Sequence, residues 1–189
     1  MLSKSNKKVF EPWKTILSEA MFSTPWMSVY HNMFELPNGK KGNYYYVHTN
    51  GSSLIVPITD SGKILMIRQY RYLFDEVSIE IPCGGIKDGQ NEAETARSEL
   101  IEETGYNCKS LKRVGKFVPY NGISDEVCHV FIATGLYFVG EKPDDTEQIE
   151  TFEADIEEID RMIQKGKITD GMSIAGWTLA KPYVIKKIK

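Results

Sequence analysis

The chain has 189 residues, of which 41% are hydrophobic and 26% charged, and its formal net charge is −3. This length and composition are typical of one globular domain with a small appendage. The acidic balance argues against a nucleic-acid partner, and the chain contains neither an 18-residue apolar run nor an apolar export signal, so we expect no membrane partner.

The first segments alternate polar and apolar residues in the manner of β-strands. Three such stretches lie between residues 10 and 49, and a turn at Asn38-Gly39 precedes the third. We expect an antiparallel β appendage in residues 1–50, followed by the main domain in residues 51–189. The appendage carries more aromatic surface than a short sheet buries alone, so it should pack on its own domain or on a second chain.

Two further strand-like segments, SSLIVPIT and KILMIRQYRYL, flank the turn Asp60-Ser61-Gly62 and predict a hairpin. The second segment ends in Arg68-Gln69-Tyr70-Arg71, which places two positive charges three residues apart. The stretch VSIEIP then leads into the turn Cys83-Gly84-Gly85.

A helix is predicted to follow this turn. Asn91 and Glu94 have the spacing of an N-cap and its reciprocal partner, and Gly105 suits the left-handed position after a helix end. At 100° per residue, Glu99 and Glu103 share one stripe, where two charges would repel by roughly 3 kcal/mol. The stripe is either a solvated acidic face or a set of ligands for a divalent cation, and the glycine-rich turn favours the ligand set.

The remaining chain predicts strands over residues 110–120 and 126–134, an acidic loop at 140–150, and two helices over 152–167 and 168–181. The three cysteines, Cys83, Cys108 and Cys128, form no CxxC pair. This pattern indicates neither a disulfide framework nor a zinc site, and it favours reduced thiols in the cytoplasm.

The stretch from Gly84 to Tyr106 resembles the Nudix box, G-x5-E-x7-R-E-U-x-E-E-x-G-U, in which U is apolar. The glycines, the glutamates at 99, 102 and 103 and the apolar positions fall in register. Gln90 stands at the first glutamate position and Ser98 at the arginine position. Because Arg97 is rotated by about 100° from position 98, we expect Glu102 to lose its neutralising partner.

The resemblance implies a Nudix-type α/β/α sandwich with a mixed sheet, extended by the N-terminal antiparallel appendage. It also implies an enzyme that uses Mg²⁺, with Mn²⁺ as the alternative. The family's metal ligands correspond to the side chains of Glu99, Glu102 and Glu103 and the backbone carbonyl of Cys83. Glu102 is in addition a candidate catalytic residue.

Most of the chain resembles the ADP-ribose and nucleoside diphosphate sugar pyrophosphatases of that family. The resemblance implies that Arg68 and Arg71 bind the diphosphate, and guanidinium groups suit phosphate oxygens. It places the general base in the acidic loop, at Glu147 or, as alternatives, Asp145 or Glu150. It further implies a homodimer whose N-terminal strands help to enclose the nucleoside base.

ADP-ribose or a related nucleoside diphosphate sugar is therefore the expected substrate. Asn121 occupies a position where the ADP-ribose enzymes carry proline, which keeps GDP-mannose or another nucleotide open as an alternative. Gln90 and Ser98 keep a second alternative open, a nucleotide-sugar binding or regulatory module that does not hydrolyse its ligand.

Overall fold

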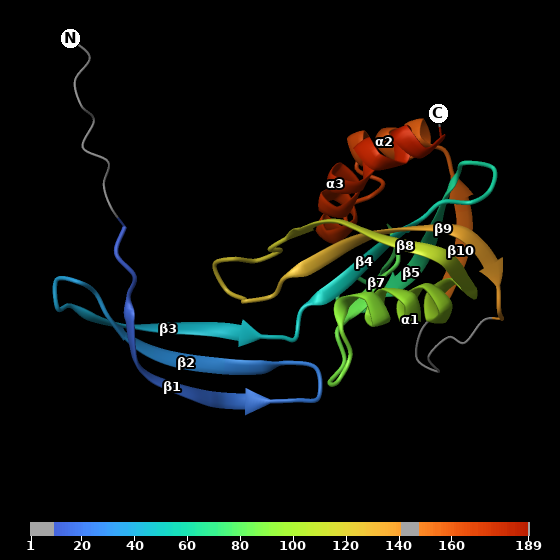
Figure 1. The fold of residues 1–189 in the computed structure, drawn as a ribbon. Coiled ribbons are helices and arrows are strands. Elements are labelled where there is room, and N and C mark those ends of the chain that lie inside the picture. The colour runs from blue at the N-terminus through green and yellow to red at the C-terminus, as the bar shows by residue number, and fades with distance from the viewer. Residues whose placement is uncertain (1–9, 141–147, 189) are drawn as a thin grey trace, which may run out of the picture.

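The computed structural model describes residues 10–140 and 148–188 (Figure 1). The strands are β1 Lys14–Ser23, β2 Ser28–Glu35, β3 Lys41–His48, β4 Ser52–Pro57, β5 Ile64–Arg71, β6 Glu76–Glu80, β7 Cys83–Gly85, β8 Tyr106–Phe117, β9 Cys128–Phe138 and β10 Ile149–Ala154. The helices are α1 Glu92–Thr104, α2 Ile156–Gln164 and α3 Gly171–Ile188. None of the described helices is long and apolar enough to cross a membrane.

The main domain is an α/β/α sandwich, as predicted. Its larger sheet has the order β7-β4-β9-β8, in which β4 and β9 run parallel and the other neighbours antiparallel. A second sheet has the order β10-β5-β6. In Figure 1, α1 covers one face of the larger sheet, and α3 covers the other.

Alternate residues of the central strand β4 supply two cores. Leu54 and Val56 are buried on one side with Trp177 of α3, while Ile55 is buried on the other side with Leu100 of α1. A strand buried on both faces reads as a continuous apolar run, as the segment SSLIVPIT does. The two helices are therefore fixed on opposite faces by successive residues of one strand.

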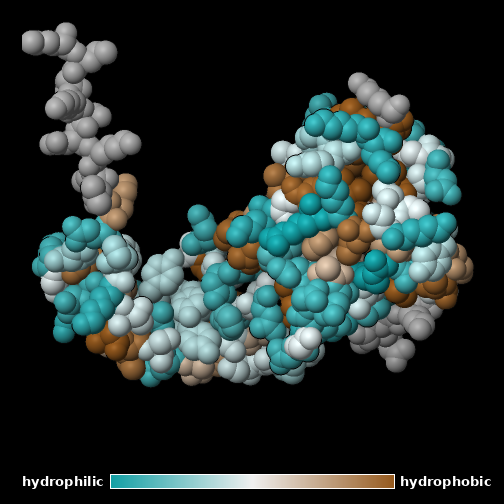
Figure 2. All heavy atoms as spheres, in the orientation of Figure 1, coloured by the Kyte–Doolittle hydropathy of each residue, from teal (hydrophilic) through white to brown (hydrophobic). Residues whose placement is uncertain are grey.

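The predicted N-terminal sheet is present and forms an arm, β1-β2-β3, that extends away from the main domain (Figures 1 and 2). Its root is fastened to the loop before β9, because the Val47 N–H donates to the Ile123 carbonyl at 2.8 Å and the Tyr44 hydroxyl donates to the Gly122 carbonyl at 2.7 Å. Along the arm, Trp13 and Trp26 remain 56% and 82% exposed. Trp13 stacks on Phe34 of the arm itself.

Two sequence predictions require correction. The strands β4 and β5 share the predicted turn but only one bridge, Ile58 to Ile64. They then enter different sheets, because β7 and β9 occupy the two edges of β4, while β5 pairs with β10 and β6. The predicted helix over 152–167 instead begins as strand β10, which pairs along β5 as far as Ala154, and only then continues as α2. Phe152 therefore lies in a strand.

Gly176 allows α3 to lie close to β4. A Cβ atom at this position would lie 2.6 Å and 2.7 Å from the two Cδ atoms of the fully buried Leu54. We expect Gly176→Ala to lower the free energy of unfolding, measured by urea denaturation, by about 1–3 kcal/mol, because the added methyl group overpacks the core. Gly171→Ala on the same helix is the control, because its Cβ would meet open space, and a comparable loss there would contradict the steric explanation.

Candidate active site

Helix α1 begins and ends as the sequence predicts. The Asn91 carboxamide oxygen accepts from the N–H groups of Ala93 and Glu94 at 3.0 Å, and the Asn91 N–H donates to the Glu94 carboxylate at 2.9 Å. Gly105 ends the helix with φ +73°. These caps fix the start of the helix, and so its rotation, relative to the preceding turn.

The acidic stripe of this helix is buried rather than solvated. Glu99 and Glu103 are 9% and 7% exposed, whereas Ala93 of the same helix lies on the surface. The Cys83 N–H donates to the Glu103 carboxylate at 3.0 Å. Two neighbouring carboxylates are thus held inside the protein, which is costly unless something other than water compensates their charge.

Gly84 makes room for the first of them. A Cβ atom on Gly84 would lie 2.1 Å from the carboxylate carbon of Glu99 and 2.3–2.4 Å from its oxygens. Only a residue without a side chain allows this carboxylate to lie against the backbone of β7. The glycine-rich turn therefore admits a carboxylate, as the sequence pattern suggested.

Glu102 has a cationic partner that the sequence did not predict. The Lys87 ammonium lies 3.1 Å from its carboxylate. Arg97 is engaged elsewhere, because its guanidinium donates to the Asn107 side chain at 2.5 Å and to the Cys108 carbonyl at 2.7 Å. The expectation that Ser98 leaves Glu102 without a neutralising partner is thus wrong, because the loop before the helix supplies the charge.

These carboxylates line a cavity of about 610 Å³ between α1, the β7 turn, β5 and the β1–β2 turn, which lies at the end of the arm nearest the main domain (Figure 1). Cys83, Gly84, Lys87, Glu99, Glu102 and Glu103 line one part of it. Gln69 and Arg71 of β5, Met172 of α3, and Pro25 and Trp26 of the β1–β2 turn line other parts. The cavity therefore brings together segments that are separated by up to 147 residues of sequence, from Pro25 to Met172.

Of the two predicted arginines, only Arg71 lines the cavity. Arg71 lines the cavity and is held by the buried Glu80, whose carboxylate accepts from the Arg71 Nε–H at 2.7 Å and from an Nη–H. This hydrogen-bonded pairing raises the pKa of Arg71 and keeps it charged. Arg68 lies outside the cavity lining, paired with Glu150 at 3.2 Å and stacked on Phe152.

Of the three candidates for the general base, only Glu150 lies among the described residues. Glu147 and Asp145 lie outside the described residues. Glu150 is described, and it is the β10 residue that pairs with Arg68. It does not line the cavity, so its present position offers no reason to prefer it as the base.

The donor set fits a hard divalent cation. Carboxylate and backbone carbonyl oxygens are the ligands that Mg²⁺ and Mn²⁺ prefer, and Gly84 leaves the Glu99 carboxylate the space it needs. Hydrogen bonding to Cys128 and burial hold the pKa of the Cys83 thiol well above its usual range, which disfavours a thiolate ligand. In the described residues, no three potential ligands already surround one point, so the side chains would turn inward to bind a cation.

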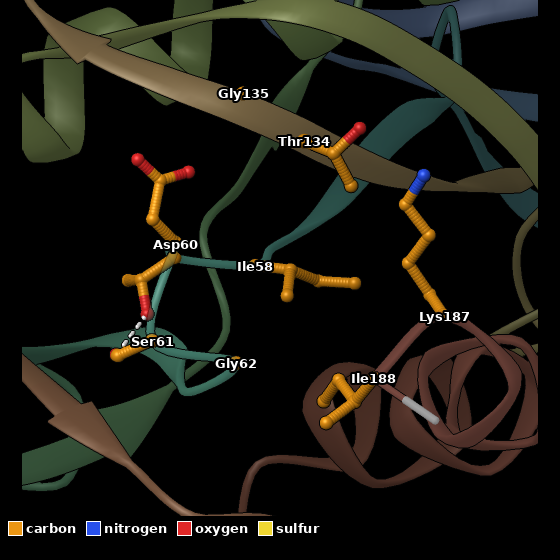
Figure 3. Close-up of a pocket in the computed structure, with 9 residues that line it drawn as sticks. Ile58, Asp60, Ser61, Gly62, Thr134, Gly135, Lys187 and Ile188 are labelled. Carbon is orange, nitrogen blue, oxygen red and sulfur yellow. Dashed lines mark hydrogen bonds between the residues drawn. The ribbon is translucent and has the colours of Figure 1, made fainter.

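A second cavity, of about 380 Å³, lies at the far end of the sheet between the β4–β5 turn, β9 and the end of α3 (Figure 3). Its polar side chains come from Thr59, Asp60, Ser61, Thr134 and Lys187. None of the sequence-predicted site residues lines it.

Gln69, Met172 and the β1–β2 turn are among the contributors to the first cavity that the sequence did not single out. Gln69 lies between the two predicted arginines, and strand alternation places it on the same face as Arg71. Met172 follows Asp170, whose carboxylate caps α3 through the Met172 and Ser173 N–H groups. The alternation of β5 was a usable signal. For the β1–β2 turn the signal was the family resemblance, which implies that N-terminal strands help to enclose the nucleoside base.

Comparison with known families matches residues 49–172 to the NUDIX domain and residues 13–47 to the nucleoside diphosphate sugar hydrolase N-terminal domain. The chain is 35% identical over 159 residues to the ADP-ribose pyrophosphatase of Bacillus subtilis (strain 168), covering 83% of this chain and 86% of that protein. It is 32% identical over 169 residues to the methanol dehydrogenase activator of Bacillus methanolicus, covering 88% and 91%.

A crystal structure of an ADP compounds hydrolase shares the fold, with a TM-score of 0.83 at 19% identity over 95% of this chain and 98% of that one. The box register, the sandwich and the family match over most of the chain agree. The chain therefore belongs to the Nudix hydrolase family.

Proposed function

We propose that the protein hydrolyses the pyrophosphate bond of a nucleoside diphosphate sugar, with ADP-ribose as the leading substrate, and releases a nucleoside monophosphate and a sugar phosphate. The observation that carries this proposal is the convergence of Glu99, Glu102, Glu103 and Arg71 on one cavity. Three carboxylates and a fixed guanidinium are suited to a diphosphate that enters with divalent cations.

The cation, the diphosphate and the attacking water would each be handled by different residues. Glu99, Glu102, Glu103 and the Cys83 carbonyl would hold Mg²⁺, or Mn²⁺ as the alternative. When bound, the cation supplies Lewis-acid neutralisation of the diphosphate charge. Arg71, oriented by Glu80, would bind a non-bridging phosphate oxygen through its remaining N–H groups. Arg68 would bind the diphosphate beside Arg71 only after its ion pair with Glu150 breaks. Glu147 would act as the general base.

The arm supports a nucleoside-binding role. Trp26, at the cavity edge, is 82% exposed and offers a flat apolar face on which a base can stack. Asn121, in the loop to which the arm root is fastened, replaces the proline associated with ADP-ribose, so GDP-mannose belongs in any substrate test.

We also propose that the chain works as a homodimer in the cytoplasm, with the appendage in residues 1–50 as the dimerisation region and the hydrolase domain in 51–189. The exposed apolar side chains of the arm, among them Trp13, Ile16 and Phe22, support a second chain as their cover. The three free cysteines fit a reducing compartment. A monomer by light scattering at micromolar concentration would count against the dimer.

The test is release of phosphorylated products from ADP-ribose, GDP-mannose and UDP-glucose, each with Mg²⁺ and with a chelator. We expect cleavage of one class that stops when the chelator removes the cation. Binding of a nucleotide sugar without any cleavage would instead favour the regulatory module that Gln90 and Ser98 suggest. Cleavage that persists in chelator would contradict the roles given to the three glutamates.

A further inference from the structure

Gln69 is a buried polar residue that the mechanism above does not use. It lies in β5 opposite Ser78 of β6 and Ile149 of β10, and it is only 6% exposed. Among the described residues its side-chain oxygen has no hydrogen-bond partner, and the atom itself is buried. Buried acceptors of this kind are rare and costly in folded proteins.

The position of Gln69 connects this unsatisfied oxygen with the cavity. Leu65 and Ile67, on the same face of β5, are buried and apolar, whereas Arg71, two residues further, lines the cavity together with Gln69. Gln69 therefore stands where the apolar core ends and the cavity begins. Methionine has nearly the same length and would fill the place without an unpaired polar atom, so packing alone does not account for the carboxamide.

Among the described residues that line the cavity, none donates a hydrogen bond to the Gln69 oxygen. A carboxylate such as that of Glu99 or Glu103 accepts hydrogen bonds and, when ionised, donates none. Arg71 does donate, but its Nε–H and one Nη–H bond to Glu80, and the function proposed above assigns its remaining N–H groups to a phosphate oxygen. A phosphate oxygen is likewise an acceptor, so the diphosphate itself cannot satisfy the Gln69 oxygen. An O–H group can.

We propose that Gln69 is a ligand-contact residue whose side-chain oxygen accepts a hydrogen bond from an O–H group in the cavity, supplied either by a sugar hydroxyl of the nucleoside diphosphate sugar or by a water molecule bound with it. The terminal carboxamide turns easily about its last torsion, so the oxygen can reach the cavity without strain in the strand. This inference rests on the proposed function, since it names a contact within the same site.

Gln69→Met tests the contact, because it keeps the length of the side chain and removes its polar atoms. Binding is measured by calorimetry with Mg²⁺ and a nucleoside diphosphate sugar whose bridging oxygen is replaced by CH₂, so that no cleavage intervenes. We expect Kd to rise about tenfold, while the urea midpoint stays unchanged or rises because a buried unpaired acceptor has been removed. Gln164→Met, in the last turn of α2, is the matched control and should change neither quantity.

Analogues that lack one sugar hydroxyl identify the source of the O–H group. If a sugar hydroxyl is the donor, the loss of binding free energy on its removal and the loss in Gln69→Met will not add, because both changes delete the same interaction. If water is the donor, the two losses will add for every deoxy analogue. An unchanged Kd, whether or not the urea midpoint falls, would overturn the proposal and leave Gln69 a packing residue.

The same measurements separate this inference from the proposed function. If the wild-type protein binds the analogue in a Gln69-dependent way but cleaves no nucleotide sugar, the contact stands and the hydrolytic function fails. If cleavage proceeds and the variant binds as the wild type does, only the Gln69 contact fails. If the wild-type protein binds no nucleotide sugar, both fail.

Discussion

Replacement of Glu103 by glutamine is expected to lower kcat for nucleoside diphosphate sugar hydrolysis on the order of 10³-fold. Cation binding in a site of this kind contributes several kcal/mol to transition-state stabilisation, and each 1.36 kcal/mol corresponds to a factor of ten in rate. Glutamine keeps the size of the side chain and an oxygen that can still accept from the Cys83 N–H, so the loss should come from the missing charge. Product release under saturating substrate and Mg²⁺ measures it.

The fold should survive this change. Glu99 and Glu103 lie one turn apart and both are buried, so removing one charge relieves their repulsion. We therefore expect the urea midpoint to stay level or rise. Glu92→Gln is the control, since Glu92 belongs to the same helix but pairs with Arg113 and does not line the cavity. Wild-type turnover of Glu103→Gln, or an equal loss in Glu92→Gln, would refute the assignment.

Local sequence signals predicted α1 well. Asn91, Glu94 and Gly105 act within one helical turn of their partners, so their spacing alone sets where the helix begins and ends. The strands of the arm and the continuous apolar run of β4 were predicted for the same reason, because burial pattern and turn residues are local properties.

The errors arose where the outcome depends on distant segments. Nothing near Ser98 in the sequence indicates that Lys87, eleven residues earlier, reaches Glu102, because that contact depends on the path of the loop. The separation of β4 and β5 into different sheets depends on β9 and β10, which follow much later in the chain. Arg68 and Arg71 looked equivalent, but strand alternation gives them opposite faces and different partners.

The carboxylates also show the limit of helical periodicity. The stripe containing Glu99 and Glu103 was identified from 100° spacing, but periodicity cannot decide whether an acidic stripe faces solvent. The deciding feature is Gly84, whose missing side chain lets Glu99 lie against β7. A glycine in an extended strand thus serves here to allow close approach of a side chain.

Gly84→Ala should accordingly reduce activity strongly with little loss of stability. The added methyl group would lie 2.1 Å from the Glu99 carboxylate carbon, so the flexible end of Glu99 must move away from its place in the cavity. A displacement of about 1 Å in such a site can cost on the order of 10²-fold in rate, and we expect a loss of kcat of that size. The free energy of unfolding should change by less than about 1 kcal/mol, because alanine also restricts the unfolded chain.

The neighbouring residue Gly85 supplies a closely matched control. It belongs to the same strand, but a Cβ atom there would meet nothing within 4 Å. Gly85 also lines the cavity, but its added methyl group would leave the Glu99 carboxylate in place, so Gly85→Ala should keep wild-type kcat in the same product-release assay. If both alanine variants lose activity equally, the effect comes from stiffening the turn; if neither does, the position of the Glu99 carboxylate is not critical. A selective loss in Gly84→Ala would tie the glycine of the box directly to the placement of its first buried carboxylate.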